Sequence, residues 1–181
     1  LGDVYKRQDL VVPMSEHRTF KYFKEESLEK YAEQFGWTLI DDSNRKDMFM
    51  DMIRQMDMSY SYKPVFAKAI LLYADDKGRV KLDDIVSYFR SYYEGRRAAG
   101  LVVEKKNSIF AKGGYTDKEA ERNILANPFK RFEDMQMLRH TKTLGIVQID
   151  ESVWKRLTKA ELAEIERICD EKLESYYTRL K

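Results

Sequence analysis

Two short patterns in this 181-residue sequence contain residue types that can attack phosphodiesters. His140 and Lys142 begin like the pattern His-x-Lys-x4-Asp, in which a histidine attacks phosphorus. Val147 occupies the aspartate position, so that pattern is incomplete. Glu104 and Lys106 match the Glu-x-Lys half of a restriction-type nuclease core, but no Pro-Asp pair precedes them. We therefore expect a solvated loop around Glu104 and no cleavage of nucleic acid.

Paired carboxylates are a further candidate for chemistry, because hard cations such as Mg²⁺ prefer carboxylate oxygens. Each pair is next to an expected turn or helix start, where acidic side chains cap helices and offset the helix dipole. We therefore interpret them as structural rather than metal-binding. The pairs are Glu25-Glu26, Asp41-Asp42, Asp75-Asp76 and Asp83-Asp84.

Cofactor chemistry has little support in the sequence. Neither of the glycine-rich loops that cradle nucleotide phosphates, GxxxxGK[ST] or GxGxxG, is present, so we expect no cofactor in this chain itself. The single cysteine, Cys169, excludes an internal disulfide, and two histidines leave zinc short of ligands. This cysteine usage favours a reducing cytoplasm as the location. Cys169 lies on an apolar helix stripe, which predicts a buried structural thiol.

Positive charge is concentrated in one segment of the chain. Between Arg90 and Lys142 there are twelve basic and seven acidic residues, a net charge of +5, whereas the whole chain carries +2. Because lysine and arginine neutralise backbone phosphates, the segment predicts binding to DNA, with RNA as the alternative. An ordinary solvated surface is the competing interpretation. The candidate residues are Arg96, Arg97, Lys118, Arg122, Asn123, Lys130, Arg131, Arg139, His140 and Lys142.

The elements that must position these side chains follow from apolar spacing and from end signals. Helical spacing places Met48 to Met56 on one face, and helices start at Ser61, at Asp83 and at Thr116. Gly95 is the expected end of the helix that starts at Asp83, and the helix from Thr116 should stop before Pro128. A short strand at 79–82 and a hairpin from 135–140 and 146–149 complete the pattern, and residues 100–111 should be irregular.

The order helix, strand, helix, helix, hairpin predicts a mainly α chain with a small β-hairpin. We expect a winged-helix-like domain with flanking helices, whose third helix and hairpin face phosphate. Its boundaries are 58–150, after a connector and helical subdomain at 9–57 and before a C-terminal amphipathic helix at 151–181. Composition (43% hydrophobic, 35% charged) fits a folded domain, and no apolar run approaches the roughly 18 residues of a membrane span.

Residues 1–8 resemble the translation of a sequencing adapter, and we exclude them from fold reasoning. On this interpretation, the chain is expected to be the C-terminal part of a longer protein. Tyr60, Tyr62, Tyr92 and Tyr93 could stack on unpaired bases, but their spacing also fits buried helix faces, which is the interpretation we favour.

Three segments of the chain resemble one protein family. The sequences MDMSYSYKPV (56–65), NPFKRFEDM (127–135) and CDEKL (169–173) are similar to the C-terminal region of bacterial superfamily-two helicases of the DEAD/DEAH-box type. The resemblance implies two ATPase lobes upstream, which would use ATP and Mg²⁺. It also implies that this region is a non-catalytic accessory domain that helps to hold DNA strands.

Two functions of another class remain open from the sequence. The chain could be an adaptor that docks its C-terminal helix, along the stripe from Leu162 to Leu173, onto a partner protein. It could also be a small inhibitor of a nucleic-acid enzyme. Charge reversal at Arg122, Lys130, Arg131 and Lys142 separates these hypotheses, because only DNA binding depends on those cations.

Overall fold

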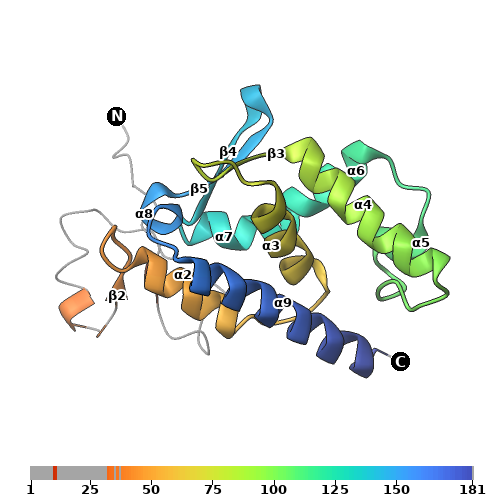
Figure 1. Ribbon diagram of the computed structural model, residues 1–181, viewed down its shortest axis with the longest axis horizontal. Coiled ribbons are helices and arrows are strands. Elements are labelled where there is room, and N and C mark those ends of the chain that lie inside the picture. The colour runs from red at the N-terminus through yellow and green to blue at the C-terminus, as the bar shows by residue number, and fades with distance from the viewer. Residues whose placement is uncertain (1–9, 12–31, 35, 37, 181) are drawn as a thin grey trace.

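Figure 1 shows the computed structural model, which describes residues 10–11, 32–34, 36 and 38–180. The chain is mainly helical and has a small three-stranded antiparallel sheet, as expected from the sequence. The expectations for residues 1–9 and 12–31 lie outside the described residues. The elements are β1 (Leu10–Val11), β2 (Thr38–Leu39), α2 (Arg45–Arg54), α3 (Tyr62–Tyr73), β3 (Arg79–Lys81), α4 (Leu82–Ala98), α5 (Ile109–Lys112), α6 (Asp117–Ile124), α7 (Lys130–Asp134), β4 (Leu138–Thr141), β5 (Ile146–Ile149), α8 (Glu151–Trp154) and α9 (Lys159–Arg179).

The predicted strand and hairpin form one antiparallel sheet in the order β3-β5-β4. Val80 is opposite Val147, and Val147 is opposite His140 on its other side. Because side chains alternate along a strand, these residues share the inner face, which packs on the core. Arg79 and Arg139 are both opposite Gln148 and therefore lie on the outer face of the sheet.

Helix α4 is longer than the sequence predicts at both ends. Asp83 is not its cap, because the helix begins at Leu82 after the extended residue Lys81, and Asp83 lies in the first turn instead. A carboxylate there still offsets the positive end of the helix dipole. Gly95 does not end the helix, which continues to Ala98. Many helices end at a left-handed residue, and Gly100, with φ of +68°, supplies one after α4.

Helix α6 starts as predicted and ends as predicted. The hydroxyl of Thr116 accepts a hydrogen bond from the backbone N–H of Glu119, whose carboxylate accepts one from the backbone N–H of Thr116. The helix ends at Ile124 and passes into a wide helical turn at Leu125–Phe129. Asn127 leaves the helical conformation there, ahead of Pro128, which cannot donate a backbone hydrogen bond.

The long amphipathic helix predicted at the C-terminus is α9, with a capping box formed by Thr158 and Glu161. It packs against α2 and α3, and Figure 1 shows it running alongside both. A hydrogen bond from Lys46 lowers the pKa of the Glu161 carboxyl to about 2 and fastens α9 to α2. Residues 151–158 form α8 and a turn, so the long helix begins at Lys159.

The apolar stripe of α9 is buried inside the chain. Ile165, Ile168, Cys169 and Leu173 all lie in the core. Burial raises the pKa of the Cys169 thiol to about 12, which confirms the prediction of a structural thiol. The stripe that an adaptor would use for docking is therefore covered by α2 and α3. Residues of the predicted divisions 9–57, 58–150 and 151–181 all contribute to one continuous core.

Candidate nucleic-acid interface

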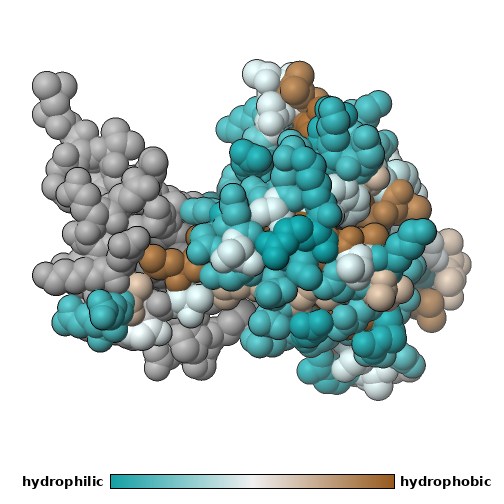
Figure 2. All heavy atoms as spheres, turned by 60° about the vertical axis from the view of Figure 1, so that its left-hand side comes forward, coloured by the Kyte–Doolittle hydropathy of each residue, from teal (hydrophilic) through white to brown (hydrophobic). Residues whose placement is uncertain are grey.

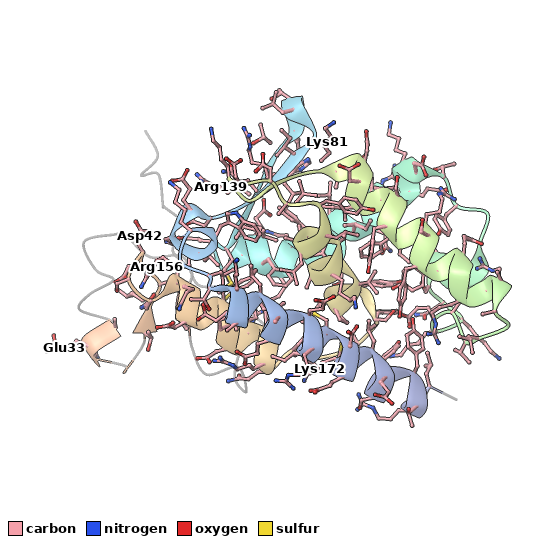
Figure 3. The ribbon with its side chains drawn as sticks, viewed as in Figure 1. Glu33, Asp42, Lys81, Arg139, Arg156 and Lys172 are labelled. Carbon is pink, nitrogen blue, oxygen red and sulfur yellow. The ribbon has the colours of Figure 1, made fainter. Side chains whose placement is uncertain are left out.

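Three cations lie on or beside the β4–β5 hairpin. Arg139 lies on the outer face of β4 with a side chain that is 68% exposed, Lys142 follows in the turn, and Lys81 ends the neighbouring strand β3. Figure 3 shows Lys81 and Arg139 on either side of the hairpin. We call Lys81, Arg139 and Lys142 the hairpin cations. No aspartate or glutamate occurs between Leu138 and Ile149, so the hairpin itself is purely basic.

Neighbouring carboxylates compensate the charge of the hairpin cations only weakly. Arg139 forms a loose ion pair with Asp150, at 3.9 Å, a separation that is too long for a direct hydrogen bond. Arg79, on the same sheet face, is different, because Asp75 accepts a hydrogen bond from its side chain at 2.8 Å. That bond, together with backbone bonds, lowers the pKa of the Asp75 carboxyl. Arg79 is thus neutralised locally, whereas the hairpin cations point to solvent.

The turn that carries Lys142 is firmly built. Lys142–Leu144 forms one turn of 3₁₀ helix, and Gly145 follows in the left-handed conformation with φ of +59°. The backbone N–H of Gly145 donates to the carbonyl of Lys142 at 3.2 Å. The carbonyl of Gly145 accepts from the N–H of Leu82 at 2.8 Å, which joins the turn to the first residue of α4. These hydrogen bonds therefore fix the backbone of the hairpin turn relative to α4.

The third helix, α6, is less basic than the sequence argument assumed. Lys118 and Arg122 are exposed on it. The same eight residues include Asp117, Glu119 and Glu121, so the helix carries a net charge of −1. The net positive charge of the segment from Arg90 to Lys142 therefore comes from residues outside α6. The side-chain amide oxygen Oδ1 of Asn123 is buried and has no hydrogen-bond partner among the described residues, so it points away from solvent.

Arg96 and Arg97 serve the fold. The Arg97 guanidinium bonds to Glu94 at 2.7 Å and to the carbonyl of Phe110 at 2.6 Å, which fastens α5 to α4. Arg96 donates to the carbonyl of Val102 at 2.7 Å, and its guanidinium lies over the ring of Tyr177, 3.3 Å from the ring centre. Both lie at the far end of α4 from the hairpin. A helix of 17 residues is about 25 Å long, so the two arginines lie far from the hairpin cations.

The remaining candidates divide between α7 and the inner face of the sheet. Lys130 forms ion pairs with Glu133, at 3.3 Å, and with Asp134 in the same short helix. Arg131 is half-buried near Lys63, whose pKa is lowered by burial and also by the Arg131 charge. His140 lies on the inner face of β4, with its ring 6.0 Å from that of Phe129. Arg139 and His140 therefore point to opposite faces, although they are neighbours in sequence.

Of the four tyrosines considered for base stacking, Tyr60, Tyr62, Tyr92 and Tyr93, two belong to the core. Tyr62 and Tyr93 are buried, which confirms the core interpretation for them. Tyr60 stacks on Tyr62, with ring centres 4.7 Å apart, and Lys105 lies on its ring at 5.2 Å. One face of the half-buried Tyr60 ring is thus taken up by Tyr62. Tyr92 is half-buried and packs edge-on against Tyr93 at 5.1 Å.

Glu104 is not in a solvated loop, contrary to the sequence interpretation. Only 5% of the residue is exposed. Its carboxylate accepts hydrogen bonds from the backbone N–H of Ser61 at 2.8 Å, from the Ser61 hydroxyl and from the hydroxyl of Tyr176. The Ser61 hydroxyl also contacts that of Tyr93 at 2.7 Å. This cluster joins the α4–α5 connection to the start of α3 and to the end of α9, so the role of Glu104 is structural.

Within the described residues, no group of three or more histidine, cysteine, aspartate or glutamate side chains is placed to hold a metal ion. No helix of the described part is both long and apolar enough to cross a bilayer. Comparisons of the sequence with protein-family models, with curated proteins and with solved structures found no match.

Of the predicted site residues, the structure brings Arg139 and Lys142 together, with Lys81 beside them. Sequence reasoning missed Lys81 because it lies outside the segment from Arg90 to Lys142 in which charge was counted. A signal was available in the alternation Arg79-Val80-Lys81, which places the two cations on one face of a strand. Its position beside the hairpin follows only from the strand order β3-β5-β4.

Proposed function

We propose that this chain is a non-catalytic, nucleic-acid-binding accessory domain of the winged-helix type. The order α3, β3, α4, α6, β4, β5, into which the short helices α5 and α7 are inserted, and the sheet order β3-β5-β4 support this assignment. In that arrangement the turn at 142–145 is the wing. DNA is the proposed partner, with RNA as the alternative to be separated by experiment.

One observation carries the proposal: two exposed cations of the hairpin, Arg139 and Lys142, and one on the adjacent strand, Lys81, lie at a hairpin that contains no acidic residue. Lysine and arginine that neutralise phosphates release condensed counterions, and this release drives binding without sequence preference. Phosphate contacts of this kind position a domain on nucleic acid but do not read base sequence. The net charge of −1 on α6 makes that helix a poor contact surface, so the hairpin side is the proposed interface.

The resemblance to the C-terminal region of DEAD/DEAH-box helicases extends the proposal to the parent protein. On this proposal, upstream lobes bind ATP and Mg²⁺, and this domain holds DNA for them. The test is the coding sequence upstream of Asp9. A phosphate-binding loop and a DEAD/DEAH box in the same reading frame would support the proposal. Initiation of translation at Met14, with a promoter immediately upstream, would contradict it.

Nucleic-acid binding is tested by fluorescence anisotropy of labelled duplex DNA and RNA over a salt series. The variant Lys81→Ala, Arg139→Ala, Lys142→Ala should weaken binding and reduce the slope of log K against log salt by about 2.7, since each phosphate contact contributes about 0.9. A matched control removes three exposed lysines elsewhere, Lys106, Lys112 and Lys159. Equal losses in both variants, or no binding by the unmodified chain in dilute buffer, would refute the proposed interface.

A further inference from the structure

The tip of the hairpin ends in an exposed apolar side chain. Leu144 is 69% exposed, more than any other large apolar side chain recorded as exposed in the described residues. A single exposed leucine is common on protein surfaces and by itself implies nothing. Its surroundings distinguish Leu144 from the others, because it is the residue of the hairpin turn that follows Lys142 and Thr143.

The turn holds Leu144 in a fixed position. Its backbone belongs to the 3₁₀ turn, and the next residue, Gly145, is bonded both to Lys142 and to Leu82 of α4. Fixing a side chain in advance removes part of the entropy cost of using it in a contact. A rigid apolar tip can thus enter a gap that a mobile loop would enter only at a larger entropic cost.

The tip is apolar within a basic and polar border. Figure 2 shows brown atoms at the top of the molecule, over the hairpin, next to white and teal atoms. Behind the tip, Ile146 lies between Lys81 and Thr141 in the sheet register. A polyanion drawn to the hairpin cations would therefore meet Leu144 at the end of the same surface.

We propose that Leu144 inserts between neighbouring bases of a DNA duplex bound by the hairpin. This inference rests on the proposed nucleic-acid binding and specifies what the hairpin does to the DNA. Leucine side chains can act as wedges that partly unstack a base step and kink the duplex. The contact buries the exposed leucine against bases, while the hairpin cations hold the flanking phosphates. Pyrimidine–purine steps such as TA unstack most easily, so duplexes that contain TA steps should be bound better than A-tracts.

The test uses the full chain and duplexes that carry 2-aminopurine at a TA step, because this base fluoresces more strongly when it is unstacked. Binding of the unmodified chain should raise the fluorescence. The variant Leu144→Ser should abolish this rise and weaken binding about tenfold, while the salt slope stays unchanged, since no cation is lost. The matched control is Leu101→Ser, which changes another exposed leucine in the α4–α5 connection. The control should behave like the unmodified chain.

The outcomes separate this inference from the proposed function. If the unmodified chain binds duplexes but the fluorescence does not rise, or rises equally with Leu144→Ser, the wedge is refuted while nucleic-acid binding stands. If Lys142→Ala lowers the salt slope, and Leu144→Ser removes the fluorescence rise and weakens binding without changing the salt slope, both are supported. If the chain binds no duplex, both are refuted. Circular dichroism of each variant excludes a folding defect as the cause.

Discussion

The buried carboxylate of Glu104 makes a sharp test of the fold. Glu104→Ala removes the acceptor for the backbone N–H of Ser61 and for the hydroxyl of Tyr176. Each buried donor left without a partner costs about 1–3 kcal/mol, whereas the Ser61 hydroxyl keeps Tyr93 as a partner. Removing a buried charge offsets part of this loss. We therefore expect the free energy of unfolding to fall by about 2–4 kcal/mol.

The assay is urea unfolding followed by circular dichroism, with the m value checked for constancy. The control Glu171→Ala removes an exposed glutamate paired with Arg167 and should change stability by less than about 0.5 kcal/mol. Tyr176→Phe should be destabilising alone but should cost much less when Glu104 is already alanine, because the two side chains share one hydrogen bond. If Glu104→Ala stays within about 0.5 kcal/mol of the unmodified chain, the buried cluster is refuted.

Two further predictions concern charge. The pKa of Glu161 is about 2 in the folded chain against an ordinary value of 4.5, so its stabilising effect is present above pH 4.5 and is lost as the pH falls towards 2. Glu161→Gln should therefore lower the melting temperature at pH 7, with a difference that shrinks towards pH 2; a constant difference would contradict the assignment. Asp83→Asn removes an exposed carboxylate two residues after Lys81 and should tighten DNA binding about two- to fivefold at low salt, with less effect at high salt. Anisotropy titrations check this, and unchanged affinity would place bound phosphate away from the hairpin.

Local signals identified most of the secondary structure. The capping box at Thr116 located the start of α6, because both hydrogen bonds of a capping box form between residues three apart. The structure has a second capping box at Thr158, which starts α9 later than the predicted boundary at residue 151. The start of α3 near Pro64 and the hairpin were identified in the same way. Errors occurred where a local signal was ambiguous, as at Gly95, which remained helical inside α4.

The candidate site was less predictable from local signals. Counting charge along a segment grouped Arg97 with Lys142, although the two lie near opposite ends of α4. It also omitted Lys81, which reaches the hairpin by strand pairing over a long sequence separation. Whether an arginine is available to a ligand depends on which carboxylates and carbonyls surround it, and Arg97 is surrounded by Glu94, Phe110 and Ala111.

The sequence by itself determined the longer helices, the hairpin, the buried character of the α9 stripe and the presence of a basic segment. It missed the short helices α5, which lies largely in the stretch 100–111 expected to be irregular, α7 and α8. These properties depend on spacing and on contacts between residues a few positions apart. Only the tertiary structure decided that Glu104 is buried, that His140 faces the core and that Lys81, Arg139 and Lys142 share one exposed surface. Burial and the neighbours of a charge arise from segments that are distant in the chain, and the pattern along the chain does not record which segments will meet.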